Sequence, residues 1–261
     1  MSPRSYLFVP GNRPERFDKA LASAADAVIV DLEDAVAPDQ KDAARRSVSA
    51  WLSVTRPVVL RINATDTPWH RDDLAVCRQP GVAAVMVAKA ERADVLAALA
   101  LSVPLLPLIE SAAGFDRLGE IAAVPGVQRL AFGAIDFQLD MNMRATFDEL
   151  IHFRSKLVLA SRLAGLLPPI DSPSVAIEEE AEVEREAQAA RRLGFTAKLC
   201  IHPNQLAVVN RSFSPSEAEL SWARQVISMA QASGGAAVAL DGKMIDKPVI
   251  LRARAILAEA R

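Results

Sequence analysis

Cysteine is scarce in this chain, and the two cysteines form no recognisable pattern. Cys77 and Cys200 lie far apart among 261 residues, and no CxxC pair occurs. Disulfide frameworks and cysteine zinc sites depend on several closely spaced cysteines. We therefore expect neither, and predict that both residues are buried thiols in a reducing cytosol.

The sequence also lacks an excess of charge of one sign and a long apolar run. The chain has 30 Lys and Arg residues and 32 Asp and Glu residues, so its formal net charge is −2. It therefore lacks the excess of basic residues that binds nucleic acid or an anionic membrane surface. No run approaches the roughly 20 apolar residues that span a bilayer. The N-terminal segment 1–17 has no apolar region typical of a signal peptide. These absences favour a cytoplasmic protein without nucleic-acid or membrane partners.

What the sequence does contain is a repeated alternation of short apolar runs and helical segments. The runs, rich in Val, Ile and Leu, occur at 6–11, 27–34, 57–63, 83–90, 104–111, 129–137, 167–172 and 197–203. Alternating strands and helices predict a parallel sheet with right-handed crossovers. Eight strands within about 200 residues favour one closed (β/α)₈ barrel of the α/β class over an open sheet with a second domain.

The C-terminal part of the chain extends beyond the eightfold repeat. The segment 214–231 is expected to be the eighth barrel helix, and a break at Gly234 and Gly235 follows it. We predict a catalytic barrel domain over 1–233 and a helical lid or extension over 234–261.

Polar residues stand where the apolar runs end, which is where barrels of this kind carry their active sites. In chain order they are Asp31, Glu33, Asp34, Arg61, Asn63, Lys89, Glu110, Asp136, Asp171 and His202. Acids or bases at so many consecutive strand ends predict one shared site at the mouth of the barrel.

Glu110 and Asp136 are the candidate metal ligands of that site. They end neighbouring runs, and neighbouring strands lie about 4.8 Å apart, so their charges repel unless a cation or a shared proton relieves them. Taken alone, Glu110 is explained by a helix dipole. A pair of acids bound to Arg61 and Lys89 is the structural alternative, but with no histidine or thiolate cluster nearby the pair favours Mg²⁺, which prefers oxygen ligands.

Arg61 is the candidate anion-binding residue, because a guanidinium can hold a carboxylate or a developing enolate oxygen through paired donors. Asp31 or Glu33 could hold the guanidinium in place. Lys89 could form a Schiff base if it were desolvated, but several neighbouring acids favour an ion pair.

Several motifs together resemble one known family. "SYLFVPGNRPERFDKA", "VIVDLEDAVAPDQKDAAR", "VLRINA", "LIESAAG", "FGAIDF" and "GFTAKLCIHPNQL" occur in that order, and "GKMIDKP" follows in the tail. In order and spacing they resemble the citrate lyase beta-subunit-like family of the HpcH/HpaI aldolase group, which includes the malyl-CoA and citramalyl-CoA lyases. The resemblance covers nearly the whole chain.

The resemblance implies a (β/α)₈ barrel that forms homotrimers or larger oligomers. It implies Mg²⁺, with Mn²⁺ as a possible substitute, and cleavage or formation of a carbon–carbon bond next to an acyl thioester. Glu110 and Asp136 match the metal-binding acids, and Arg61 matches the active-site arginine.

The resemblance assigns roles to three further residues. Asp246, in "MIDKP", matches an acid on a C-terminal lid that reaches a neighbouring subunit's site. Arg13 and Lys19 occupy the region in which relatives hold coenzyme A. Asp31, Glu33, Asp34 and Lys89 are expected to support the metal and substrate groups.

Two departures from the family pattern leave the substrate open. Ile135 stands in "GAID", where relatives often carry an acid, and the segment after Asp171 lacks a "DxEGL"-like run. We expect a lyase that converts a β-hydroxyacyl-CoA such as citramalyl-CoA or malyl-CoA into an acyl-CoA and a 2-keto acid. The alternatives are the citryl-transferring β subunit of citrate lyase, a Schiff-base aldolase using Lys89 or Lys198, a non-catalytic barrel that binds CoA esters, and a thioesterase step added to the lyase reaction.

Overall fold

The protein folds into two compact units. The computed structural model describes residues 2–232, 238–240 and 243–260. One unit is Pro3–Val209, and the other comprises Asn210–Arg261 together with Met1–Ser2.

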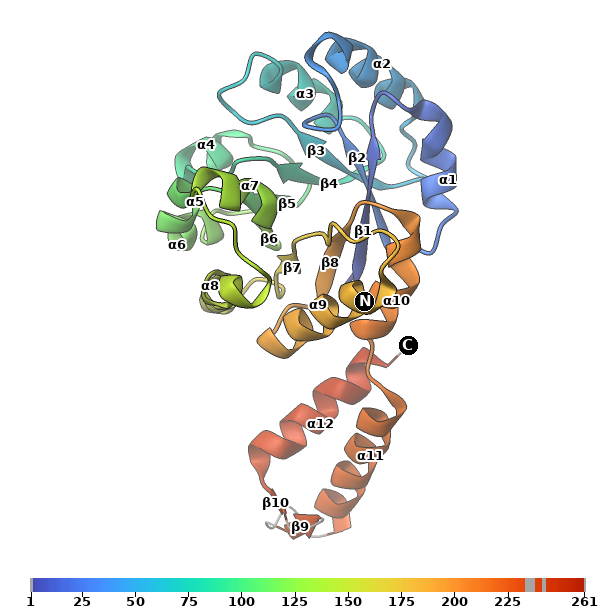
Figure 1. Cartoon of the computed structure of the whole chain (residues 1–261), viewed down its shortest axis with the longest axis vertical. Helices are drawn as coiled ribbons and strands as arrows, with labels where there is room; N and C mark the ends of the chain where they lie inside the picture. The colour runs from blue at the N-terminus through green and yellow to red at the C-terminus, as the bar shows by residue number, and fades with distance from the viewer. Residues whose placement is uncertain (1, 233–237, 241–242, 261) are drawn as a thin grey trace. The chain divides into compact units, whose positions relative to one another are not determined.

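The unit Pro3–Val209 is a closed barrel of eight parallel strands that pair in chain order, with β1 closing on β8 (Figure 1). The strands are β1 (Ser5–Pro10), β2 (Ala27–Asp31), β3 (Val58–Ile62), β4 (Val82–Val87), β5 (Leu105–Ile109), β6 (Ala131–Phe132), β7 (Ile170–Asp171) and β8 (Ala197–Cys200). Each falls within or beside one of the eight apolar runs. The predicted (β/α)₈ barrel is therefore confirmed.

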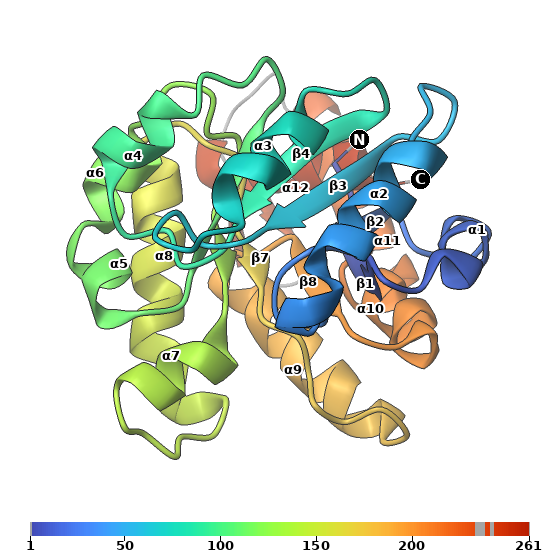
Figure 2. The ribbon, with the colours of Figure 1, turned by 90° about the horizontal axis from the view of Figure 1, so that it is seen from above.

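Helices connect the strands and lie outside them, as α2, α3 and α4 show (Figure 2). Their bounds are η1 (Pro14–Arg16), α1 (Phe17–Leu21), η2 (Pro38–Gln40), α2 (Lys41–Trp51), α3 (His70–Cys77), α4 (Ala93–Ala98), α5 (Ala112–Asp116), α6 (Leu118–Ala122), α7 (Ala134–Asp140), η3 (Asp148–Leu150), α8 (Ile151–Leu163), α9 (Glu180–Leu193), η4 (Pro203–Gln205) and α10 (Leu206–Ser212). The strands are thus enclosed on their outer face, as their continuous apolar character requires.

The barrel interior is filled by every second residue of each strand. The interior cluster consists of Tyr6, Ile29, Val59, Ala84, Met86, Leu106, Leu108, Ala131, Ile170, Ala197 and Leu199. Because side chains alternate between the two faces of a strand, the next interior position after Val59 is Arg61, and the next after Leu108 is Glu110. The pattern that packs the core therefore also directs these two charged residues into the C-terminal mouth of the barrel.

The second unit is built on two long helices. It contains α11 (Glu217–Ala232), the antiparallel pair β9 (Val238–Leu240) and β10 (Lys243–Ile245), and α12 (Lys247–Glu259). Leu220, Ala223 and Val226 on α11 form one buried cluster with Ala253 and Ile256 on α12. The apolar stripe of α11 is therefore covered by α12.

The helix expected over 214–231 exists as α11, but it groups with α12 and not with the barrel unit. The sequence showed an apolar stripe without showing which surface covers it. The predicted domain boundary between 233 and 234 falls on residues outside the described part of the chain and stays a prediction.

Within the described ranges, no helix combines the length and apolar character needed to cross a membrane.

Candidate active site

A cavity of about 690 Å³ opens at the C-terminal ends of the barrel strands. Its charged lining residues are Arg16, Lys19, Asp31, Asp34, Arg61, Glu110 and Asp136. Most of the residues predicted from strand ends are therefore brought together. Arg13, which precedes η1, is not among the lining residues, and Asp246 belongs to the second unit.

Arg61 is held by two carboxylates, one of which, Asp31, also lines the cavity. Its Nε and Nη2 donate to Asp31 at 2.7 and 2.6 Å, and Nη1 lies 3.1 Å from Glu33 Oε2. The guanidinium also stacks 4.7 Å from the centre of the Phe8 ring. Of its five N–H donors, these contacts occupy three, and no described residue accepts the other two.

The charge of Arg61 is secured by the same contacts. Burial lowers the pKa of the guanidinium, but Asp31 and Glu33 raise it more, and the net shift is upward. Arg61 is thus a fixed cation that retains unused donors, which is what recognition of an anionic oxygen requires.

Glu33 and Lys89 are not lining residues, but Glu33 pairs with both Arg61 and Lys89. Burial raises the pKa of Glu33 to about 7, although Arg61 lowers it. Lys89 Nζ lies 3.6 Å from Glu33 Oε1, and the Asp34 backbone N–H donates to Glu33 Oε2 at 2.9 Å. Glu33 therefore acts on the cavity through its contact with Arg61.

Glu110 is buried directly after β5, with one carboxylate oxygen bound and the other without a donor. Oε1 accepts the backbone N–H of Lys89 at 2.8 Å. Lys89 adopts a left-handed backbone, with φ +48°, which is costly for a residue with a side chain and accompanies this contact. No residue in the described part of the chain donates a hydrogen bond to Oε2.

Gly133, which follows β6, provides the space that the Glu110 carboxylate occupies. A Cβ atom at position 133 would lie 2.4 Å from Glu110 Oε2 and 2.6 Å from Glu110 Cβ. No side chain fits at 133 while Glu110 keeps this position. Glycine is therefore required here by the Glu110 side chain, its Cβ atom included, and not by the backbone angles.

Asp136 reaches the cavity from the first turn of α7. The run 129–137 predicted a strand ending at Asp136, but β6 ends at Phe132 and α7 begins at Ala134. Asp136 is half-buried, and no described residue forms a hydrogen bond or ion pair with its carboxylate. A helix, and not a strand end, therefore presents this carboxylate to the cavity.

The electrostatics of Glu110 show that two carboxylates share the site. Burial raises the pKa of Glu110 to about 8, the Lys89 N–H lowers it, and the charge of Asp136 raises it. Among the described residues, no group of three or more His, Cys, Asp or Glu side chains could hold a metal ion. Glu110 and Asp136 each offer a carboxylate oxygen that no described residue binds. Such oxygens fit Mg²⁺, which commonly takes one or two carboxylates and completes its coordination shell with water and substrate oxygens.

The raised pKa of Glu110 predicts how pH affects the metal-free protein. An unfolded chain ionises this carboxyl near 4.5, whereas the folded one ionises it near 8. Between pH 4.5 and pH 8 the unfolded state thus binds fewer protons than the folded state. The free energy of unfolding therefore decreases as the pH rises through this range. We expect Glu110→Gln to raise the melting temperature of the metal-free protein by roughly 5 °C at pH 9 and by little at pH 4. Thermal melts of both proteins in a chelator measure the difference, and parallel curves at all pH values would contradict it.

The two lysines considered for Schiff-base chemistry are both ion-paired. Burial lowers the pKa of Lys89, but Glu33, Asp34 and Glu110 raise it more. Lys198 Nζ lies 2.8 Å from Asp171 and 3.2 Å from Glu186, and its side chain is 1% exposed. A charged amine is not nucleophilic, so neither lysine is prepared to attack a carbonyl carbon.

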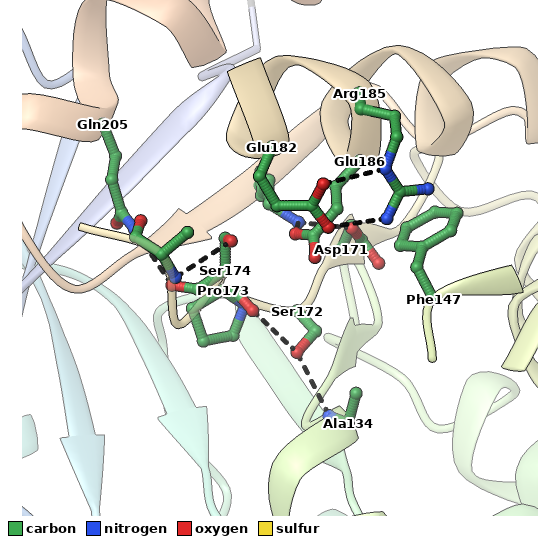
Figure 3. A network of polar contacts seen from close by, with 12 residues as sticks. Ala134, Phe147, Asp171, Ser172, Pro173, Ser174, Glu182, Arg185, Glu186 and Gln205 are labelled. Atoms are coloured by element: carbon green, nitrogen blue, oxygen red, sulfur yellow. Dashed lines mark hydrogen bonds and ion pairs between the residues drawn. The ribbon is translucent and has the colours of Figure 1, made fainter. Parts of the chain in front are cut away.

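Asp171 does not contribute to the cavity, contrary to its predicted place at the mouth. Ile170 belongs to the barrel interior, so Asp171, the next residue, points outward. It is fully buried and binds Arg154 Nε and Lys198 Nζ, both at 2.8 Å. Figure 3 shows it close to Glu186 of α9. Its role is to join strands β7 and β8 to the helices outside them.

Several lining residues were not identified from the sequence as site residues. Arg16 lines the cavity three residues before Lys19, and Ser172 and Ile201 line it after β7 and β8. Ser172 and Ile201 could have been predicted from the alternation of side chains along the strands, since they follow the interior positions Ile170 and Leu199 by two residues. His202, one of the predicted strand-end residues, lines the cavity, and its Nδ1 accepts the Asn204 backbone N–H at 3.2 Å.

Comparison with known proteins identifies relatives along the whole chain. The model of the HpcH/HpaI aldolase/citrate lyase family matches residues 4–203. A citrate lyase subunit beta-like protein of Deinococcus radiodurans is 35% identical, covering 98% of this chain and 96% of its own. A (3S)-malyl-CoA thioesterase of Cereibacter sphaeroides is 37% identical, covering 98% and 94%.

A solved structure with the same fold is protein CitE from Mycobacterium tuberculosis in complex with magnesium, acetoacetate and coenzyme A. It has a TM-score of 0.89 and 36% identity, and the match covers 98% of this chain and 97% of that one. The family model and the whole-length relatives agree with the barrel and with the resemblance seen in the motifs. The chain therefore belongs to the HpcH/HpaI aldolase/citrate lyase family of carbon–carbon lyases.

Proposed function

We propose that this protein is a Mg²⁺-dependent lyase that cleaves or forms a β-hydroxyacyl-CoA thioester such as citramalyl-CoA or malyl-CoA. The products of cleavage are an acyl-CoA and a 2-keto acid. The observation that carries the proposal is one cavity holding two carboxylates with free oxygens, Glu110 and Asp136, beside Arg61 with unused donors. The magnesium, acetoacetate and coenzyme A bound by the relative CitE support it.

Glu110 and Asp136 are the residues that would hold the metal, with Mn²⁺ as a possible substitute for Mg²⁺. When bound there, the ion supplies Lewis acidity that stabilises negative charge on the hydroxyl and carboxylate oxygens of the substrate. Gly133 leaves the space that the Glu110 carboxylate occupies, and the Lys89 backbone N–H orients Glu110 Oε1.

Arg61 is proposed to stabilise the charge that forms on the thioester oxygen. On cleavage, the hydroxyl gives its proton to solvent and becomes the keto group, and the electron pair of the broken carbon–carbon bond moves into the acyl-thioester enolate. The two free donors of Arg61 would bind that enolate oxygen, and Asp31 and Glu33 hold the guanidinium so that little reorganisation is needed.

The coenzyme A portion is assigned to the cationic side of the cavity formed by α1 and η1. Lys19 and Arg16 are exposed lining residues there, and their charges suit phosphate groups. Arg13, proposed from the family resemblance, directly precedes η1 and is not a lining residue. It would contact a part of the ligand outside the cavity.

Asp246 is proposed to return a proton to the enolate carbon, or to remove it in the condensation direction, from a neighbouring copy in a homo-oligomer such as a trimer. Its carboxylate caps α12 by accepting the Val249 N–H at 3.3 Å. Asn is an equally good N-cap but cannot exchange this proton. We expect Asp246→Asn to lower kcat about 10²- to 10⁴-fold with an unchanged melting temperature. Asp246→Ser, which also keeps the cap, should behave alike, and normal turnover in either variant would exclude the acid–base role.

The assay that tests the proposed function combines acetyl-CoA or propionyl-CoA with glyoxylate, pyruvate or oxaloacetate in the presence of Mg²⁺. Mass spectrometry should detect a new β-hydroxyacyl-CoA that does not form in EDTA. No carbon–carbon product from any pair would refute the proposal. Borohydride added with a keto acid should leave the protein mass unchanged, and a covalent adduct would instead indicate a Schiff-base aldolase.

A thioesterase step is the second candidate, because a (3S)-malyl-CoA thioesterase is among the whole-length relatives. Hydrolysis after condensation would give a free hydroxy acid and free coenzyme A. The same mass spectra distinguish the two outcomes, since a lyase alone leaves the thioester intact.

Gly133→Ala tests whether the placement of the Glu110 carboxylate matters for turnover. The new Cβ would overlap Oε2 and force the carboxylate aside, and displacement of a reacting group by about 1 Å costs on the order of 10²-fold in rate. We expect this loss in the condensation assay. Gly119→Ala on α6 is the matched control, because nothing lies within 4 Å of its Cβ position. Equal activity of the two variants would contradict the role of Gly133.

A further inference from the structure

An apolar part of the cavity lining comes from the exits of β6, β7 and β8, where the polar residues Asp136, Ser172 and His202 also line the cavity. We call it the apolar wall and define it by the lining residues Ile135, Pro173, Ile201 and Pro203. Ile201 is an interior position by strand alternation, two residues after Leu199 of the interior cluster. The apolar wall is therefore a continuation of the barrel core into the cavity.

The two isoleucines of the apolar wall are exposed to solvent within the cavity. Ile135 is 49% and Ile201 is 41% exposed, although both line a concave site. Exposed apolar surface in a cavity gains free energy when a ligand's aliphatic group covers it. The exposure therefore points to an apolar part of a ligand.

Hydrogen bonds hold the apolar wall in position. Gln205 is 2% exposed, and its Nε2 donates to the carbonyls of Ser174 at 2.9 Å and Ala176 at 2.8 Å. Its Oε1 accepts the Ile201 backbone N–H at 2.9 Å, so one side chain joins the exits of β7 and β8. The Ala134 N–H donates to Ser172 Oγ at 3.3 Å and joins β6 to β7. The wall is thus preorganised and does not depend on a ligand for its shape.

The cationic lining residues come from other strands. Arg16 and Lys19 follow β1, which pairs with β8, and Arg61 lies on β3. In the described part of the chain, no Lys or Arg lines the cavity from the exits of β6 to β8. A carboxylate placed against Ile135 and Pro173, at the exits of β6 and β7, would lose its hydration without gaining a cationic partner from these exits, and Asp136 beside Ile135 would repel it.

We propose that the apolar wall receives an aliphatic substituent of the 2-keto acid and thereby selects it. This inference rests on the proposed function. The keto and carboxylate oxygens of the substrate would face Glu110 and Asp136, and Ile135, adjacent to Asp136 in α7, would contact the group on the next carbon. The preferred keto acids are then those with a methyl or ethyl substituent, such as pyruvate and 2-oxobutyrate, and those with a second carboxylate, such as oxaloacetate, are rejected.

The test measures kcat/KM for condensation of acetyl-CoA with glyoxylate, pyruvate, 2-oxobutyrate and oxaloacetate in Mg²⁺. A desolvated charge without a partner is rejected strongly, so we expect pyruvate to exceed oxaloacetate by at least about tenfold. Equal or better use of oxaloacetate would overturn the inference while leaving the lyase proposal intact.

Two variants locate the selectivity. Ile201→Lys adds a cation to the apolar wall and should raise the oxaloacetate-to-pyruvate ratio at least about tenfold. Ile177→Lys is the matched control, because Ile177 is 42% exposed but is not a lining residue. Ile135→Thr should lower the ratio of 2-oxobutyrate to glyoxylate about fivefold. Ratios that stay at the wild-type value in both wall variants would refute the assignment.

Calorimetric titration of the same keto acids into the Mg²⁺-loaded protein provides a readout without turnover. Tighter binding of pyruvate than of oxaloacetate supports the apolar wall, and the reverse order contradicts it. If no pair of substrates reacted, the proposed function would be wrong, and the binding order would still decide whether the wall selects aliphatic keto acids.

Discussion

Glu110→Gln is expected to lower kcat/KM in the condensation assay about 10³-fold, equivalent to about 4 kcal/mol of lost transition-state stabilisation. The amide keeps the size of the side chain and can still accept the Lys89 N–H at 2.8 Å. It removes the charge that would hold the metal, and it leaves Asp136 as a single carboxylate in the cavity.

A second readout separates metal binding from chemistry. Mg²⁺ should raise the melting temperature of the wild-type protein, because a ligand that binds only the folded state stabilises it. The shift should disappear in Glu110→Gln. Glu91→Gln is the control, since Glu91 binds Ser111 Oγ at 2.7 Å, one residue from Glu110, and does not line the cavity. A Mg²⁺ shift that persists in Glu110→Gln would reject this carboxylate as a metal ligand.

Arg61→Lys is expected to lower kcat about 10²- to 10³-fold, although it preserves the positive charge. An ammonium group is a point charge and cannot bind Asp31 through two parallel donors while also reaching a ligand oxygen. The substitution also leaves Asp31 and Glu33 less well paired in a buried position, so the melting temperature should fall.

The control for Arg61→Lys is the same substitution at Arg56. Arg56 also pairs with a carboxylate, Asp18 at 3.0 Å, and stacks on Trp51, but its side chain is 40% exposed and lies outside the cavity. Exposed ion pairs contribute little to stability. Arg56→Lys should therefore keep turnover near the wild-type value, and near-normal kcat in Arg61→Lys would remove Arg61 from the mechanism.

The barrel could be predicted from the sequence because its signal is redundant. Eight apolar runs separated by helical segments specify strand number and order even where a single boundary is wrong. The run 129–137 shows such an error, since it contains a strand of two residues followed by the start of α7. Apolar residues such as Phe132 and Phe137 are buried in either conformation, so hydrophobicity alone does not separate them.

The candidate site was predictable in part, because it depends on which strand face each residue occupies. Arg61 and Glu110 lie in phase with the interior positions, whereas Asp171 lies one residue out of phase and is bound by Arg154 and Lys198. A list of polar strand ends treats the three alike. The phase becomes clear only when the interior residues are known, and long-range partners such as Lys198 have no local signal.

The contact between Gly133 and Glu110 has a consequence for reading related sequences. The two residues are separated by a complete βα unit, yet a side chain at 133 would overlap both the Cβ atom and the carboxylate of Glu110, so the present arrangement cannot hold both side chains. Glu110 and Gly133 should therefore occur together in related sequences. In a homologous chain, a residue larger than glycine at this position would mark a barrel in which the segment carrying the glutamate has moved, before any assay of its activity.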